Sequence, residues 1–202
     1  MVDRTAPDAS VTALVAELAG RAKTASRRLA LLSRADKDAA LHAIADALDA
    51  AIPAVVQANA DDLTQGRERG MAEGLLDRLM LDEARIRAIA EAVREVAALP
   101  DPVGEVVRGS TLANGLQIRQ VRVPMGVVGM IYEARPNVTV DAAALGLKSG
   151  NAVILRGGSA AAASNRALVA VIRAALAERG LPEDAVTLLD EGGHDAARAL
   201  MT

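Results

Sequence analysis

The chain has 202 residues, of which 51% are hydrophobic and 24% are charged, and its net charge at pH 7 is −3. This composition is typical of a folded globular protein and excludes an intrinsically disordered chain. There is no cysteine, which excludes disulfides and a thiol nucleophile within the chain. The two histidines are too few for a histidine-rich metal site. Tyr132 is the single aromatic residue, so nucleic-acid bases have almost nothing to stack on and a nucleic-acid partner is disfavoured.

The N-terminal segment, residues 1–10, is polar and charged. It lacks the basic-then-apolar order of a signal peptide. No uncharged apolar stretch approaches the roughly 18 residues of a membrane span. We therefore expect a cytoplasmic protein with no membrane partner.

Residues 10–100 are predicted to be helical, because apolar residues recur in them at helical spacing. Ser33 and Asp36 form a capping-box pattern that predicts the start of the second helix. Pro53 should kink that helix or end it nearby, and Asp82 can cap a third helix. The link between the second and third helices is marked by Gly66, Gly70 and Gly74.

A β-hairpin is predicted next, after a change to alternating polarity. Its strands are residues 103–109 and 116–123, and residues 110–115 form the turn, with Asn114-Gly115 as the strongest turn signal. The outward faces carry Arg108, Arg119 and Arg122. The edges of such a hairpin are exposed unless something pairs with them, so it could serve as an arm toward another subunit.

An α/β pattern begins at Gly126. Three apolar runs predict strands at residues 126–132, 152–155 and 185–189, and the first, being continuous, is expected to be buried on both faces. Helices are predicted at residues 138–148 and 160–179 and after Gly192-Gly193. Strands that alternate with helices indicate part of a doubly wound parallel sheet. The final helix has no stop signal and no returning strand follows it, so we expect the front part of a longer protein.

The turn after the second of these strands, Arg156-Gly157-Gly158-Ser159, could bind a phosphate. Glycines allow close approach of a ligand, and the N-terminus of the following helix would offer free N–H groups and a positive dipole end. Arg156 adds a permanent charge, and Ser159 could cap the helix or donate to an oxygen. The alternative is an ordinary glycine-bearing turn with a surface arginine. The usual dinucleotide fingerprint, G-x-G-x-x-G, is absent.

A second candidate site, residues 132–141 (YEARPNVTVD), follows the first strand, where open α/β sheets place their ligands. Pro136 suits the first turn of a helix. Asn137 could cap that helix, or its amide could stabilise a developing oxyanion. Local chemistry leaves both roles open.

Residues 123–158, VPMGVVGMIYEARPNVTVDAAALGLKSGNAVILRGG, contain both candidate sites. This segment resembles the gamma-glutamyl phosphate reductase (glutamate-5-semialdehyde dehydrogenase) family of the aldehyde dehydrogenase superfamily. The resemblance extends over essentially the whole chain and includes ANADDL at 58–63, LDRL at 76–79, DPVG at 101–104 and GLP at 180–182.

The resemblance implies an aldehyde dehydrogenase-like cofactor domain in three parts. Residues 1–100 would be its helical part, residues 101–124 a β-hairpin that could be an oligomerisation arm, and residues 125–202 an incomplete α/β dinucleotide-binding domain. The implied reaction is the NADPH-dependent reduction of L-glutamyl 5-phosphate to L-glutamate 5-semialdehyde with release of phosphate, in proline biosynthesis. The complete protein is expected to be a homo-oligomer.

The resemblance also assigns roles to the site residues. Asn137 matches the asparagine that stabilises the oxyanion, and Arg135 is a candidate for binding the substrate's phosphate or carboxylate. Arg156 takes the place of a basic residue that contacts the adenosine ribose and its phosphate. Many superfamily members carry a glutamate near Ser159 and Ala160, and its absence here favours NADP. The implied cofactor-binding residues are Arg156, Gly157, Gly158, Ser159, Gly192 and Gly193.

One departure from the family concerns catalysis. In such enzymes a cysteine thiolate attacks the acyl phosphate to form a thioester, which hydride from NADPH then reduces, and that cysteine lies in a later domain. Residues 1–202 contain no cysteine, so we predict that they do not catalyse the reaction alone. The alternatives are a non-catalytic nucleotide-binding module and an interaction fragment.

Overall fold

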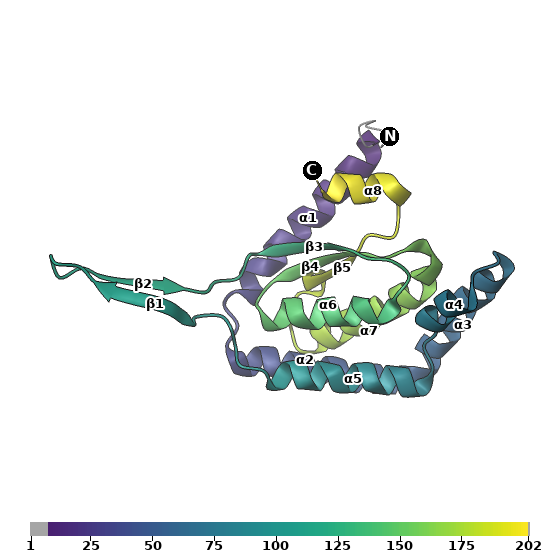
Figure 1. The fold of residues 1–202 in the computed structure, drawn as a ribbon, viewed down its shortest axis with the longest axis horizontal. Coiled ribbons are helices and arrows are strands. Elements are labelled where there is room, and N and C mark those ends of the chain that lie inside the picture. The colour runs from purple at the N-terminus through teal and green to yellow at the C-terminus, as the bar shows by residue number, and fades with distance from the viewer. Residues whose placement is uncertain (1–7, 202) are drawn as a thin grey trace.

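A parallel three-stranded sheet lies at the centre of the computed structural model, which describes residues 8–201, and a two-stranded hairpin projects from the body (Figure 1). Most of the N-terminal segment that was compared with a signal peptide, residues 1–7, lies outside the described residues. The N-terminal half is helical as predicted, and its helices are α1 (Ala9–Leu29), α2 (Arg34–Ala50), α3 (Ile52–Glu68), α4 (Glu73–Leu79) and α5 (Glu83–Ala98).

The predicted helix boundaries follow from local hydrogen bonds. The Ser33 hydroxyl accepts from the Asp36 backbone N–H and the Asp36 carboxylate accepts from that of Ser33, which completes the capping box of α2. Pro53 lies in the first turn of α3, which is bent by 68° from α2. The Asp82 carboxylate accepts from the Arg85 backbone N–H at 2.7 Å and begins α5.

The glycine-marked link is more helical than predicted, because α4 lies within it. Gly66 is inside α3, where a Cβ would meet Leu76 of α4 at 3.0 Å, so this glycine lets α4 pack closely. Gly74 is inside α4. Only Gly70 of the three has a left-handed backbone (φ +71°), and it lies just beyond the end of α3.

Three parallel strands, in the order β3-β4-β5, form the sheet. They are β3 (Val127–Ile131), β4 (Ala152–Arg156) and β5 (Val186–Leu188). The crossover helices α6 (Pro136–Lys148) and α7 (Ala162–Glu178) cover one face, while α1 and α8 (Gly193–Leu200) cover the other. Short 3₁₀ turns, η1 (Ser159–Ala161) and η2 (Glu183–Ala185), precede α7 and β5. Helices α2 and α5 form an outer layer against α6 and α7 (Figure 1).

The prediction that the first strand is buried on both faces is wrong. Val127 and Val128 are half-buried, but the last three residues of β3 are exposed. The physical reason is its position, because β3 is an edge strand that pairs only with β4 in the described part of the chain. The central strand β4 is buried as predicted, with Ala152, Val153, Ile154 and Leu155 each at most 2% exposed.

The segment from η1 through α7, Ser159–Glu178, is long and apolar enough to cross a membrane by length and composition alone. Within the molecule it packs against α2, α3, α6 and β5, and Leu168, Ile172 and Leu176 are fully buried. Its apolar side therefore belongs to the hydrophobic core.

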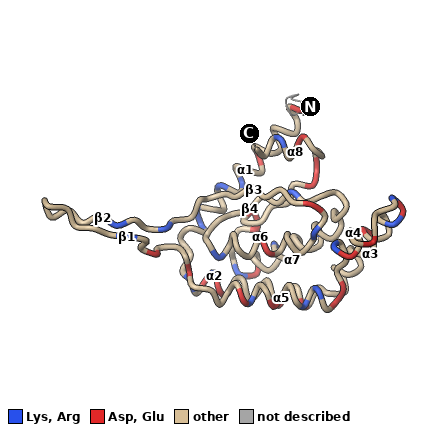
Figure 2. The backbone as a smooth tube through the Cα atoms, in the orientation of Figure 1, with Lys and Arg blue, Asp and Glu red and all other residues tan. Residues whose placement is uncertain are grey.

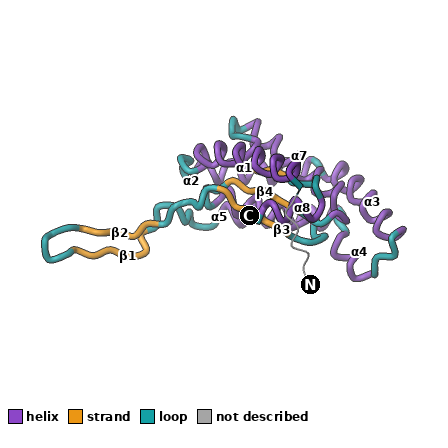
Figure 3. The backbone as a smooth tube through the Cα atoms, turned by 90° about the horizontal axis from the view of Figure 1, so that it is seen from above, coloured by secondary structure: helices purple, strands orange, loops and turns teal. Residues whose placement is uncertain are grey.

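The predicted hairpin is present as β1 (Val106–Thr111) and β2 (Gln117–Val121), paired antiparallel. Ser110 and Thr111, which were assigned to the turn, still pair with β2, and Gly115 takes the left-handed conformation of the turn (φ +86°). All residues of both strands are exposed, and the hairpin extends away from the helical body in two views (Figures 1 and 3). Residues 109–118, the outer part of the hairpin, include no charged residue, and the tube is tan there (Figure 2). By the strand register, Arg108, Arg119 and Arg122 lie nearer the base.

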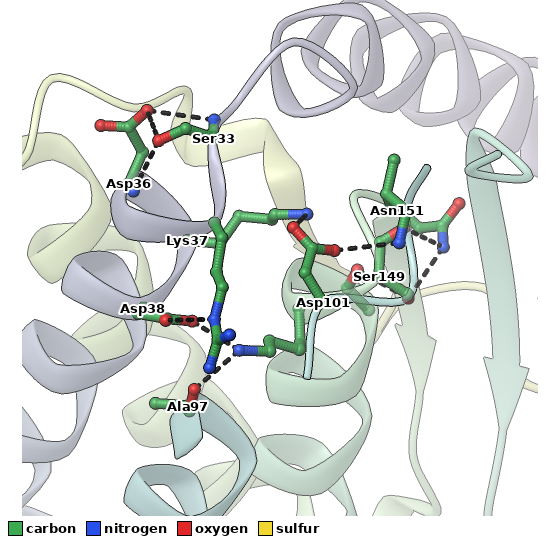
Figure 4. Close-up of polar contacts among 12 residues, drawn as sticks. Ser33, Asp36, Lys37, Asp38, Ala97, Asp101, Ser149 and Asn151 are labelled. Atoms are coloured by element: carbon green, nitrogen blue, oxygen red, sulfur yellow. Dashed lines mark hydrogen bonds and ion pairs between the residues drawn. The ribbon is translucent and has the colours of Figure 1, made fainter. Parts of the chain in front are cut away.

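Two buried lysines join the helices near the base of the hairpin (Figure 4). The Lys37 ammonium lies 2.5 Å from the Asp101 carboxylate, in the segment that leads into β1. The Lys148 ammonium, at the end of α6, contacts Asp38 at 2.5 Å and the Ala97 carbonyl at 2.6 Å. Burial raises the pKa of Asp101, but the Lys37 ammonium and the backbone N–H of Val103 outweigh it, and the net pKa is below the ordinary value.

Candidate functional site

A cavity of 190 Å³ lies at the carboxyl ends of β4 and β5. Larger hollows lie away from the carboxyl ends of the strands, one of 530 Å³ between α1 and the segment before β5 and one of 690 Å³ between α2 and α7. The smaller cavity is the candidate site, because open α/β sheets bind ligands just beyond the carboxyl ends of their strands. Its lining residues are Arg156, Gly157, Gly158, Ser159, Ala162, Asn165, Arg166, Leu188, Leu189, Asp190 and Gly193.

The two glycines of the turn are required by the protein itself. A Cβ at Gly157 would lie 2.3 Å from Asn165 Nδ2 and 3.1 Å from the Tyr132 ring. A Cβ at Gly158 would meet the backbone of Glu133 and Ala134 at 3.1 Å. The turn after β4 is therefore packed tightly onto the segment after β3, and the two candidate sites are in direct contact.

Arg156 holds two glycine turns together. Its guanidinium donates to the Gly157 carbonyl and, from the other terminal nitrogen, to the Gly193 carbonyl, both at 2.7 Å. Gly192 and Gly193 have positive φ angles of +74° and +54° at the start of α8. Five of the six residues that the resemblance assigns to the cofactor line this one cavity. The sixth, Gly192, does not line it but is the chain neighbour of Gly193, which does.

Two N–H groups in the first turn of α7 are not available to a phosphate, because they are already bonded within the protein. The buried carboxylate of Asp62, on α3, accepts from the backbone N–H of Ala163 at 3.1 Å and of Ser164 at 2.8 Å, and from the Ser164 hydroxyl at 2.6 Å. A carboxylate at this end of a helix also satisfies its dipole. The helix end is thus capped by the protein, and the cavity lies over η1 and the glycine turn.

Ser159 does not cap α7, because it begins the intervening turn η1 and the cap position is Ala161. Its exposed side chain lines the cavity. The cavity also contains a carboxylate that sequence analysis missed. Asp190, just after β5, accepts from Arg166 Nε at 2.5 Å. With Arg156, the cavity therefore has two guanidinium groups and one carboxylate, a net charge of +1.

Asn137 and Arg135 lie at the start of α6, outside this cavity. The cap position is Arg135, and Asn137 makes no side-chain capping bond; instead its amide donates to the Asp141 carboxylate at 3.1 Å. The capping role considered for Asn137 is therefore wrong. Burial raises the pKa of Asp141, and the hydrogen bond from Asn137 only partly opposes it. Arg135 is exposed.

The family model described as the aldehyde dehydrogenase family matches residues 5–202. The chain belongs to the aldehyde dehydrogenase family. Among solved structures, gamma-glutamyl phosphate reductase from Thermotoga maritima superposes with a TM-score of 0.90 at 41% identity, covering 93% of this chain and 45% of that one. The enzyme of the same name from Saccharomyces cerevisiae has a TM-score of 0.83 at 34% identity, covering 89% and 47%.

Curated relatives give the same result for the sequence. A gamma-glutamyl phosphate reductase from Kineococcus radiotolerans is 67% identical over 182 residues, which are 90% of this chain and 42% of that protein. One from Thermobifida fusca is 57% identical over 93% of this chain and 45% of its own length. The chain therefore spans less than half the length of these relatives. The predicted resemblance and the aldehyde dehydrogenase-like α/β fold are confirmed.

Proposed function

We propose that this aldehyde dehydrogenase-family chain is the NADP(H)-binding part of an enzyme that reduces L-glutamyl 5-phosphate. The reaction would consume NADPH and a proton and produce L-glutamate 5-semialdehyde, NADP⁺ and phosphate, in proline biosynthesis and in the cytoplasm. The observation that carries the proposal is the positively charged cavity over the glycine turn, in a chain 67% identical to a gamma-glutamyl phosphate reductase.

The cavity's residues fit part of a dinucleotide. Its 190 Å³ is below the roughly 300–1,000 Å³ of pockets that enclose a whole drug-sized ligand, so it suits one phosphorylated ribose end of the cofactor. The Arg156 guanidinium and the Ser159 hydroxyl supply donors for phosphate oxygens. Asn165 adds an amide nitrogen to the same wall.

The net charge of the cavity favours NADPH over NADH. The carboxylate of Asp190 could accept a hydrogen bond from a ribose hydroxyl. Arg166 already pairs with this carboxylate, so the repulsion between Asp190 and a 2′-phosphate is offset. Residues 159 and 160, Ser and Ala, add no further carboxylate. We therefore expect NADPH to bind more tightly than NADH.

Asn137 and Arg135 are assigned to the substrate side of the site. They follow β3 at the same edge of the sheet as the glycine turn, so a substrate there would lie near the bound cofactor. The cofactor supplies the hydride when bound. The Asn137 amide would stabilise the developing oxyanion, and the Arg135 guanidinium would hold the substrate's phosphate or carboxylate.

Titration of the chain with NADPH and NADH tests the cofactor assignment. Arg156→Glu should weaken NADPH binding by at least about tenfold, because a charge-assisted contact is replaced by repulsion. Arg119→Glu makes the same charge change on the exposed hairpin and should leave the affinity unchanged. Equal affinities for the two variants would remove Arg156 from the cofactor site. A wild-type chain that binds neither nucleotide would favour the alternative of an interaction fragment.

The substrate assignment needs the native protein purified from its source cells. It should reduce NADP⁺ when L-glutamate 5-semialdehyde and inorganic phosphate are both present, which is the proposed reaction in reverse. NADP⁺ reduction that does not depend on phosphate would overturn the acyl-phosphate substrate. Sedimentation of the same material tests the expected homo-oligomer.

A further inference from the structure

Asn165, in the first turns of α7, is a buried polar residue in the wall of the cavity. Its side chain is only 2% exposed. A buried amide is costly unless its donors and acceptors are paired, so the directions of its hydrogen bonds indicate what this residue does.

The carbonyl end of the Asn165 amide is fixed by a short chain of hydroxyl groups. The Thr139 hydroxyl, on α6, donates to Asn165 Oδ1 at 2.8 Å. Thr139 has a single hydroxyl proton, so the contact of 2.6 Å between Thr139 Oγ1 and the Tyr132 hydroxyl must use the tyrosine's proton. Burial raises the pKa of Tyr132, so that proton is present at neutral pH.

The nitrogen end of the amide is left without a partner. With Oδ1 held by Thr139, Asn165 Nδ2 points toward Gly157, where it lies 2.3 Å from the place a Cβ would take. No hydrogen bond is formed by Nδ2 within the described residues, although every fully buried side-chain nitrogen and oxygen there has a partner. Asn165 lines the cavity and its Oδ1 is held by Thr139, so Nδ2 is the end of the amide that is left to bond a ligand there.

We infer that Asn165 Nδ2 donates a hydrogen bond to a phosphate oxygen of the nucleotide bound over the Gly157-Gly158 turn, and that Tyr132 and Thr139 hold the amide in this orientation. The inference rests on the proposed function. A phosphate is the acceptor that fits, because the cavity is lined by two guanidinium groups against one carboxylate. The phosphate is either the 2′-phosphate of NADPH or the pyrophosphate shared by both cofactors.

Substitutions at Asn165, tested by titration with NADPH and NADH, decide this inference. Asn165→Asp keeps the acceptor for Thr139 but replaces the donors with a negative oxygen, so NADPH binding should weaken by at least about tenfold. Asn165→Ala removes atoms beside Gly157 without adding any, and it should weaken binding by about fivefold or more. The alanine variant keeps the test valid if the aspartate variant does not fold.

The control is Asn151→Asp, the same change at another buried asparagine. Asn151 bonds to Gly126 and Ser149 at the opposite end of the strands, so this variant should lose stability without losing nucleotide affinity (Figure 4).

Thr139→Val removes the hydrogen bond that orients the Asn165 amide and should weaken NADPH binding less than Asn165→Asp does. The Tyr132 absorbance, the only aromatic signal of the chain, shows whether the turn is intact in each variant.

The two nucleotides distinguish the two phosphates. A loss confined to NADPH assigns Nδ2 to the 2′-phosphate, and an equal loss with NADH assigns it to the pyrophosphate. Folded Asn165→Asp and Asn165→Ala variants that bind both nucleotides like the wild type would overturn the inference and leave the proposed function intact. A wild-type chain that binds neither nucleotide would overturn both.

Discussion

The carboxylate of Asp62 should be one of the largest single contributors to the stability of α7 and the cavity beside it. It is 4% exposed and accepts three hydrogen bonds from the first turn of α7, two of them from backbone N–H groups. Hydrogen bonds to a charged group contribute about 1.5–3 kcal/mol each, but they are not additive and water can replace part of them. Since loss of a helix cap alone costs about 0.5–2 kcal/mol, we expect Asp62→Ala to lower the free energy of unfolding by about 3 kcal/mol.

Urea unfolding followed by far-ultraviolet circular dichroism measures this loss, which should lower the midpoint by about 1 M. Asp61→Ala is the matched control, because Asp61 is the exposed neighbour on the same helix and its variant should stay within about 0.5 kcal/mol of the wild type. Asp62→Asn keeps one acceptor oxygen and should lose about half as much as the alanine variant. If Asp62→Ala and Asp61→Ala unfold at the same urea concentration, the carboxylate does not stabilise α7.

Three further predictions concern packing, pH and activity. Gly146→Ala should cost about 1–3 kcal/mol, because its Cβ would lie 2.4 Å from Val153, and adding Val153→Ala should recover part of the loss in the same urea assay. Asp101→Asn should cost about 3 kcal/mol at pH 7 by leaving Lys37 buried and unpaired. The pKa of Asp101 is lower in the folded than in the unfolded chain, so its carboxylate contributes its full share of the free energy of unfolding only above the unfolded pKa. The stability difference between Asp101→Asn and the wild type should therefore shrink as the pH falls below about 4. Finally, the chain alone should show no phosphate-dependent reduction of NADP⁺ with the semialdehyde, because it has no cysteine.

Each of these has a result that would contradict it. A double variant no more stable than Gly146→Ala would show that the helix shifts away from β4 instead of clashing with Val153. If the stability difference between Asp101→Asn and the wild type stays constant from pH 7 to pH 3, the ion pair between Asp101 and Lys37 does not stabilise the fold. Turnover by the purified chain would require a nucleophile other than a thiol.

Features set by a few neighbouring residues could be predicted from the sequence. The capping box at Ser33, the cap at Asp82 and the turn at Asn114-Gly115 each depend on residues at most a few positions apart. The strand β4 and the turn at Gly157-Gly158 after it were predicted correctly for the same reason. The fold class followed from the order of these elements, which is a local property repeated along the chain.

Features that depend on distant partners could not be predicted. A continuous apolar run does not reveal whether a strand is central or at an edge, so β3 was expected to be buried. The partner of Asp62 is about a hundred positions further along the chain, and that of Arg166 lies beyond another strand. Asn165 carries no local pattern, and its free nitrogen is recognisable only once Thr139 is seen to hold the oxygen.

The link between α3 and α7 also has a consequence for the order in which the chain folds. Asp62 leaves the ribosome 101 positions before Ala163, so its carboxylate stays hydrated until that further stretch of chain is made. Contacts of such long range slow folding, because a large loop must close before they form. The first turn of α7 should therefore be among the last of the described elements to become ordered, even though the sequence of that helix is strongly helix-forming.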